Sequence, residues 1–261
     1  MRKVRRHREE LGEVIEVFAD RPGPKTVTGF VLGWVLFTAL TFINPGETPL
    51  LAIAPGIIFA VMFGLILLYL SGERLIVCER GILVGSIAAG IHPYAIPYQQ
   101  LTPGSIAGVA GANRYLKEVG LQGQIAQSTL RASWWTKNGV HFVACSAEDA
   151  RRGRRRFTLA LDPIPRSIDG RWIWFAGTGR RPARSAIEVI ARAASAAGYP
   201  QLAQAALDRG VVELTGNPED AARQLPGHPP VGRVESDSRD SGHLRPRLES
   251  PGVEHSLPLF R

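Results

Sequence analysis

The sequences TVTGFVLGWVLFTALTFI (residues 26–43) and LLAIAPGIIFAVMFGLILLYL (residues 50–70), joined by the turn NPGETP (44–49), decide the organisation of this chain. Neither apolar segment contains a charged side chain. Their lengths match the roughly 17 to 25 residues that an α-helix needs to cross the hydrocarbon core of a bilayer. We therefore expect a transmembrane helical hairpin with two spans.

Two other structures contain long apolar segments, namely a helix pair buried in a soluble core and a cleaved signal peptide. A core helix of this length usually keeps a polar face, and a signal peptide has a shorter apolar run followed by a cleavage site. Both ends of the hairpin carry the basic residues Arg2, Lys3, Arg5, Arg6, Arg8, Arg21, Lys25, Arg74 and Arg80, whereas the turn carries only Glu47. The positive-inside bias then predicts an integral protein of the cell membrane with both termini in the cytoplasm.

Small residues follow a regular pattern inside both apolar segments. Gly29 and Gly33 form a GxxxG pair in the first, and Gly56, Ala60 and Gly64 repeat every four residues in the second. Small side chains let helix backbones approach each other closely. We expect these faces to pack the two helices on each other, with self-association between copies of the chain as the lesser option.

Strand patterns replace the helical pattern after Gly72. The segments 73–78 and 82–87 flank Glu79-Arg80-Gly81, which is typical of a β-hairpin because glycine adopts the positive φ that a tight turn requires. Further strands are expected at 94–98, 129–136, 140–145, 155–161 and 171–175. Asn138-Gly139 suits a type I′ turn, so 129–136 and 140–145 are expected to form a β-hairpin. Residues 171–175 (RWIWF) are apolar on both faces, which indicates a buried strand. A helix over 183–197 follows, between Pro182 and Gly198.

The regions on either side complete the expected organisation. Residues 1–25 form a basic N-terminal segment with a short helix over 9–20, because Leu11, Val14, Ile15 and Phe18 recur at helical spacing. Residues 71–198 form the main domain, and short helices are expected within 199–225. Residues 226–261 are rich in Pro, Gly, Ser and Arg, and have too few apolar side chains to offset the entropy of ordering, so a disordered tail is expected.

Several short segments carry a family likeness. They are Gly72-Glu73-Arg74-Leu75-Ile76-Val77-Cys78-Glu79-Arg80-Gly81, Ile96-Pro97-Tyr98, Trp172-Ile173-Trp174-Phe175, and Gly177-Thr178-Gly179-Arg180-Arg181-Pro182 before an alanine-rich helix. Over roughly residues 72–197 the chain resembles the bacterial pleckstrin-homology-like (PH-like) domain, which is often attached to helical hairpins in the membrane. The long segment 104–127 departs from that pattern. The resemblance implies a bent antiparallel β-sandwich of about seven strands capped by a C-terminal helix, with no shared catalytic residues.

Motifs for catalysis, metals and cofactors are missing from the sequence. It has no GxxxxGK[ST], GxSxG or HExxH motif, and no His, Cys or Asp cluster at metal-ligand spacing. Cys78 and Cys145 have no CxxC or histidine neighbour, so reduced core cysteines are expected. We therefore predict no enzyme activity, no metal and no cofactor.

Charge is the one sequence feature that suggests a binding site. Arginines gather in the loop 151–156 and at the start of the last helix: Arg151, Arg152, Arg154, Arg155, Arg156, Arg180 and Arg181. If they face a bilayer, each contributes on the order of 1 kcal/mol toward anionic lipid. The alternative is a solvated loop, because Glu148 and Asp149 lie beside it. Because the net charge of +8 comes with arginines that flank a predicted span, nucleic acid is not expected as a partner.

The predicted function is a membrane-anchored PH-like adaptor or scaffold at the cytoplasmic face, which binds a protein partner, anionic membrane lipid, or both, without catalysis. The alternative is a component of an oligomeric membrane transport or channel assembly. Such an assembly needs a polar path, and the segments offer only Thr28, Thr38 and Thr41 inside them.

Overall fold

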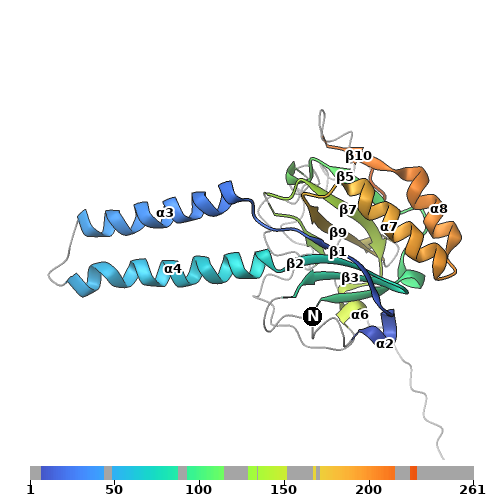
Figure 1. Ribbon diagram of the computed structural model, residues 1–261, viewed down its shortest axis with the longest axis horizontal. Helices are drawn as coiled ribbons and strands as arrows, with labels where there is room; N and C mark the ends of the chain where they lie inside the picture. The colour runs from blue at the N-terminus through green and yellow to red at the C-terminus, as the bar shows by residue number, and fades with distance from the viewer. Residues whose placement is uncertain are drawn as a thin grey trace, which may run out of the picture. The chain divides into compact units, whose positions relative to one another are not determined.

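The computed structural model describes residues 7–43, 49–87, 93–114, 129–133, 135–151, 167–168, 171–214 and 224–227. These residues form two β-sheets and two helix pairs, which is an α+β arrangement (Figure 1). One helix pair is α3 (Pro24–Ile43) and α4 (Pro49–Ser71), and the other is α7 (Ala183–Ala196) and α8 (Pro200–Arg209). Shorter helices are α2 (Arg8–Leu11), α6 (Ala147–Arg151), η1 (Tyr98–Gln100) and η2 (Ala112–Arg114).

The first sheet is antiparallel and holds the ends of the α3–α4 hairpin. Its order is β1 (Val14–Ala19), β2 (Glu73–Cys78), β3 (Gly81–Ser86) and β4 (Tyr94–Pro97). β1 pairs with β2, with Phe18 opposite Leu75. Because α3 follows β1 and α4 precedes β2, the hairpin is inserted between two hydrogen-bonded neighbours. Both of its ends are therefore fixed by the same strand pair.

The second sheet is mixed. Its order is β10 (Val211–Glu213), β5 (Ala107–Ala110), β7 (Asn138–Ala144), β9 (Arg171–Gly179) and β6 (Leu130–Arg131), with β8 (Ser167–Ile168) also paired to β9. The pairs β10–β5 and β6–β9 are parallel, whereas β7 is antiparallel to β5 and β9. The chain reaches β10 through the α7–α8 pair, which makes the parallel connection to β5 possible.

The main core lies between the two sheets and under α7. Trp174 of β9 is fully buried, and its indole Nε1 donates a hydrogen bond of 2.9 Å to the carbonyl oxygen of Cys145. Its ring stacks on Phe142 and meets the Tyr94 ring edge-on, with centroids 6.2 and 5.1 Å apart. Phe175, the next residue of β9, faces a second cluster on the other side of the sheet. The predicted buried strand is confirmed for residues 173–175, whereas Arg171 is exposed and Trp172 is half-buried.

The two apolar segments do form an antiparallel helix pair, but their membrane assignment is wrong. In the part of the chain that the structure describes, no helix meets the length and hydropathy required to cross a membrane. The predicted transmembrane hairpin is corrected on this finding. The predicted location, an integral cell-membrane protein with two spans and cytoplasmic termini, is corrected with it.

The predicted β-domain is corrected as well. A sandwich of about seven antiparallel strands with one C-terminal helix was expected over 71–198, but the described residues contain strands β1 to β10, two parallel pairings and a second helix, α8. The additional strands β1 and β10 come from outside 71–198, because the segments before α3 and after α8 both join the sheets. The fold is therefore a two-sheet α+β structure.

Local predictions have mixed outcomes. Helix α7, helix α8 and the β2–β3 hairpin lie where the sequence predicts them. The helix expected over 9–20 is wrong: only Arg8–Leu11 is helical, and Gly12, at φ 78°, separates it from strand β1. The hairpin expected over 129–145 is also wrong, because β6 pairs with β9 rather than with β7. The predicted strand 155–161 lies outside the described residues, as does the tail beyond Gly227.

Candidate functional site

The inner faces of α3 and α4 meet through aromatic rings. The ring pairs that join the helices are Phe37–Phe59, with centroids 4.1 Å apart, and Phe30–Phe63, 5.6 Å apart. Trp34 lies between Phe30 and Phe37 along α3, and its indole Nε1 donates a hydrogen bond of 3.0 Å to the carbonyl oxygen of Gly56. Because these positions recur every three to four residues, they form one continuous stripe on each helix. The inner face of each helix is therefore occupied by the other.

The predicted packing residues divide between the inside and the outside of the hairpin. Gly56 is buried, and a Cβ there would lie 3.0 Å from Cγ2 of Thr38; Ala60 is half-buried. Three other glycines are exposed, and a Cβ added to each would meet no described atom within 4 Å: Gly29, Gly33 and Gly64. Only Gly56 and Ala60 are thus placed for the expected packing of α3 on α4. The GxxxG pair of α3 faces away from α4.

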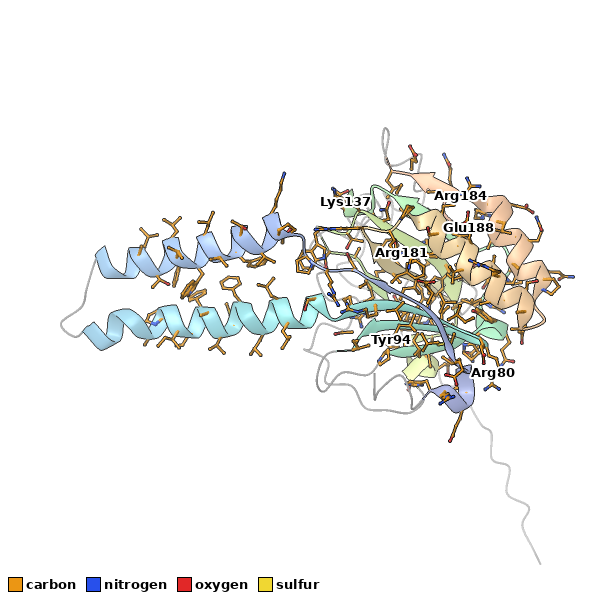
Figure 2. The ribbon with its side chains drawn as sticks, in the orientation of Figure 1. Arg80, Tyr94, Lys137, Arg181, Arg184 and Glu188 are labelled. Atoms are coloured by element: carbon orange, nitrogen blue, oxygen red, sulfur yellow. The ribbon has the colours of Figure 1, made fainter. Side chains whose placement is uncertain are left out.

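Large apolar side chains cover the outside of the hairpin. Among the described residues, those with at least a third of their surface exposed are Val27, Val31, Leu32, Val35, Leu36, Leu40, Ile57, Ile58, Val61, Met62, Leu65 and Leu68. Trp34, although it contacts α4, also keeps 37% of its surface exposed. Figure 2 shows side chains on every side of both helices. Together they leave on the order of 1,000 Å² of apolar surface, spread over the outer sides of both helices, whereas the largest single patch on a typical monomer is roughly 300 to 600 Å². Exposed apolar surface of this extent is typical of interaction sites.

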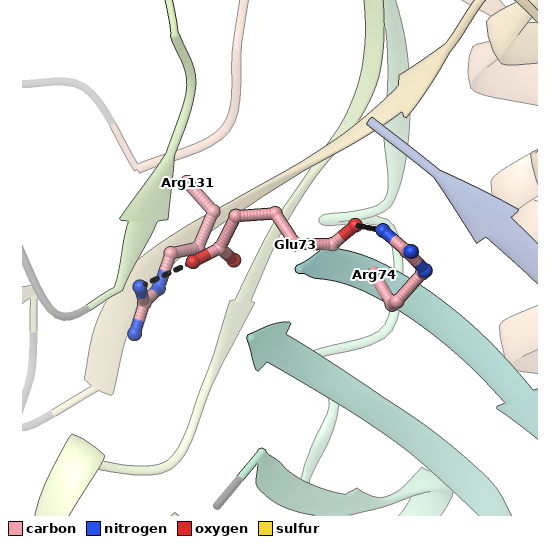
Figure 3. Close-up of polar contacts among 3 residues, drawn as sticks. All are labelled: Glu73, Arg74 and Arg131. Atoms are coloured by element: carbon pink, nitrogen blue, oxygen red, sulfur yellow. Dashed lines mark hydrogen bonds and ion pairs between the residues drawn. The ribbon is translucent and has the colours of Figure 1, made fainter. Parts of the chain in front are cut away.

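A buried ion pair joins the two sheets at the end of the hairpin. Glu73 begins β2 just after α4, and its Oε1 lies 2.9 Å from Nη1 of Arg131 in β6, with both side chains under 10% exposed. The guanidinium of Arg131 also lies 5.6 Å from the centre of the Tyr94 ring. Arg74 donates to the backbone oxygen of Glu73 at 2.6 Å (Figure 3). It also donates to the backbone oxygen of Ser71 at 2.7 Å. These contacts fix the segment where α4 enters the sheet.

Asp20 occupies the matching position where β1 leads into α3. Its backbone N–H donates to the carbonyl oxygen of Glu73 at 3.3 Å, and its Oδ2 accepts a hydrogen bond from Oγ1 of Thr136. Burial raises the pKa of Asp20 to about 6; the Glu73 carboxylate acts in the same direction, and the Thr136 hydrogen bond opposes it. Oδ1 of Asp20 and Oε2 of Glu73 are both buried without a hydrogen-bond partner among the described residues. We call Asp20, Glu73, Arg74, Arg131 and Thr136 the base cluster.

The predicted arginine site is described only in part. Residues 152–156 and the side chain of Arg151, which ends α6, lie outside the described residues. Arg180 is exposed, whereas Arg181 pairs with Glu16 at 2.6 Å and lies over the Phe18 ring. Arg184 and Glu188 point toward each other on α7 and are 3.1 Å apart (Figure 2). Lipid binding by this group stays a prediction, and one of its predicted members, Arg181, already contacts a carboxylate of its own chain.

A cleft of about 480 Å³ lies between η1 and the turn that joins α7 to α8. Tyr98, Leu101, Tyr199 and Leu202 line it, and Arg171 lies at the cleft with its Nη1 donating to Oγ1 of Thr102 at 2.8 Å. Its described lining has no carboxylate, histidine, cysteine or serine; its ionisable side chains are those of Tyr98, Tyr199 and Arg171.

The described residues show no arrangement suited to metal binding. No three His, Cys, Asp or Glu side chains within that part of the chain come together as a metal site. Cys78 is buried and Cys145 is half-buried, and neither is joined in a disulfide among the described residues. Burial raises the pKa of Cys78 to about 12, so its thiol is a poor nucleophile. Absence of a cofactor and of enzyme activity stays a prediction.

Sequence reasoning missed the base cluster. Glu73 and Arg131 are 58 positions apart and Asp20 and Thr136 are 116 apart, so no local pattern joins them. One signal was present: Asp20 and Glu73 are the acidic residues nearest to the two outer ends of the apolar segments.

Comparisons with known proteins identify no relative of this chain: no family model, no curated protein and no solved structure matches it. The resemblance to the PH-like domain therefore stays a prediction. Function has to be argued from the chain itself.

Proposed function

We propose that this protein is a scaffold that binds apolar helices of protein partners through the outer surface of the α3–α4 hairpin. The observation that carries the proposal is the apolar surface of on the order of 1,000 Å² on that hairpin. A standard protein interface takes about 800 Å² from each partner, so the hairpin alone has the area of a complete binding site.

The chemistry of the surface selects the partner. Between Lys25 and Glu73 the described residues of both helices include no charged side chain, and the few hydroxyl groups include Thr38 Oγ1, which donates to the carbonyl oxygen of Trp34. A polar partner would lose its hydration on this surface without gaining hydrogen bonds. An apolar helix instead buries carbon against carbon and keeps its own backbone hydrogen bonds.

The base cluster supports this role by fixing both ends of the hairpin. Asp20 and Glu73 are hydrogen-bonded through their backbones, and Arg131 ties Glu73 to the second sheet. A docking element whose ends are fixed loses less entropy on binding than a free one. The transport or channel alternative depended on membrane spans and is not carried further.

The test compares the native size of the full chain with that of a charged variant. We expect the wild-type chain to run as an assembly larger than its 28.4 kDa mass, and L36D/I58D to run as a monomer. The matched control is L207D, because Leu207 on α8 is also exposed but lies outside the hairpin. An assembly that survives L36D/I58D would overturn the proposal, and so would a monomer that binds only lipid vesicles.

A further inference from the structure

The cleft between η1 and the turn that joins α7 to α8 is lined by apolar side chains from both sides. Tyr98 and Leu101 come from η1 and the residue after it, and Tyr199 and Leu202 come from the start of α8. The two tyrosine rings are tilted, with centroids 6.2 Å apart. The volume of about 480 Å³ lies within the roughly 300 to 1,000 Å³ of small-molecule pockets. We call this site the tyrosine cleft.

Hydrogen bonds hold both sides of the tyrosine cleft in place. On one side, the phenol oxygen of Tyr98 donates to the carbonyl oxygen of Cys78 at 2.8 Å. On the other side, the backbone N–H of Tyr199 donates to the carbonyl oxygen of Ala194 at 2.9 Å. A ligand that enters a pocket with fixed walls loses less affinity to the ordering of those walls. The cleft is therefore suited to bind without rearrangement of the chain.

Arg171 supplies the positive charge of the described lining. It begins β9, and its Nη1 donates to Oγ1 of Thr102 at 2.8 Å, which orients the guanidinium. Among the described residues it forms no ion pair with a carboxylate, whereas Arg131 and Arg184 each have one. An arginine has five N–H donors, so donors remain for a ligand. The described lining also holds no carboxylate that would compete for them.

We propose that the tyrosine cleft binds a small organic carboxylate with an aromatic or other apolar body. The guanidinium of Arg171 holds the carboxylate, and the body packs on the tyrosine and leucine side chains. The planar guanidinium matches the two oxygens of a carboxylate. One cation balances a single negative charge, so a carboxylate fits the described lining better than a doubly charged phosphate monoester. This inference does not depend on the proposed function of the hairpin.

Isothermal titration calorimetry of the full chain tests the charge, with 2-naphthoate and its neutral counterpart 2-naphthamide as probes. We expect 2-naphthoate to bind at least fivefold more tightly, because only the carboxylate makes charge-assisted hydrogen bonds with Arg171. R171M should remove this preference and leave the affinity for 2-naphthamide unchanged. The matched control is R192M, because Arg192 is an exposed arginine of α7 that does not line the cleft. R192M should keep the preference.

The apolar side of the cleft is tested with the same two probes. Y199A removes a ring from the lining and should weaken both probes at least threefold, whereas Y199F keeps the ring and should bind both as wild type does. Circular dichroism with thermal melting checks that R171M, R192M and both Tyr199 variants stay folded.

Three results would overturn the proposal. They are equal affinities of wild type for the two probes, a lack of saturable binding at millimolar concentrations, and a preference for 2-naphthoate that survives R171M. Tighter binding of 2-naphthyl phosphate than of 2-naphthoate would overturn the assignment to a carboxylate.

Discussion

The two helix pairs of this chain use their apolar side chains differently. Helix α7 buries Ala186, Ile187 and Ile190 against the core and exposes Arg184 and Glu188. Helix α3 packs its aromatic stripe against α4, yet the sides that face away are as apolar as the side that faces in. The fold therefore covers the apolar side of α7 but leaves apolar sides of α3 exposed.

This difference shows what each pair needs. The charged outer side of α7 is compatible with water, so the α7–α8 pair is finished once it covers the sheet. An all-round apolar helix is stable only when it is covered on every side. The comparison agrees with a structural role of α7–α8 and with the binding role that we propose for α3–α4. Charges inserted into each region, and removal of charged partners, test this difference.

The largest effect is expected from a charge on the buried side of α7. Ile190 is 1% exposed, so I190D places an unpaired carboxylate in the main core. The cost is about 5 kcal/mol or more, which exceeds the stability margin of many domains. Urea unfolding followed by circular dichroism should show a chain that is largely unfolded without denaturant. A cooperative transition close to that of wild type would show that α7 is not part of the core.

The next effect concerns the base cluster. R131M leaves the buried carboxylate of Glu73 without its cation, and loss of one partner of a buried pair costs about 3 to 5 kcal/mol. The free energy of unfolding from urea titration measures this loss. The control is R184M, because the exposed Arg184–Glu188 pair contributes at most about 0.5 kcal/mol. Equal losses of unfolding free energy in R131M and R184M would contradict a stabilising role of the buried pair in the base cluster.

A smaller effect depends on pH. Burial raises the pKa of Asp20 from 3.8 to about 6, so the folded state binds the proton more tightly than the unfolded state does. This contribution to stability is fully present below pH 4 and is lost as pH rises through 6. The variant D20N has no titratable group at position 20. Relative to D20N, the unfolding free energy of wild type should fall by about 2 kcal/mol between pH 4 and pH 7. A constant difference between the two proteins over that range would refute the raised pKa.

The smallest effect on stability is expected on the outer side of α3. Leu36 is 63% exposed, so L36D should change the unfolding free energy of the single chain by less than about 1 kcal/mol, although it removes association. Unfolding measured at a concentration where wild type is dissociated gives this value. A loss as large as that of I190D would place Leu36 in a core.

The sequence predicts the elements that local signals define. Pro182 and Gly198 bracket α7, and the alternation around Gly81 predicts the β2–β3 hairpin. It fails for β1, because Leu11, Val14, Ile15 and Phe18 fit a helical spacing, while pairing with β2 decides the structure. Strand pairing over long sequence distances overrides a local pattern.

The candidate site was predictable in its residues but not in their contacts. The GxxxG pattern identified Gly29 and Gly33, yet it could not tell whether they face α4 or the outside. The apolar segments predicted helices. Because these segments are apolar on all sides, their sequence does not show which side packs on which partner. The base cluster depends on strands distant in sequence, so only the fold brings Arg131 to Glu73.

The most direct test of the proposed interface on the hairpin uses the full-length chain with the C145A substitution. It compares the rates at which a water-soluble maleimide reacts with the introduced cysteines of L36C and L207C. Both leucines are exposed in the single chain, at 63% and 47%. If the outer surface of the hairpin is a protein interface, L36C reacts at least tenfold more slowly than L207C in the native protein and at the same rate after unfolding in guanidinium. Equal or faster reaction of L36C in the native protein would contradict the account.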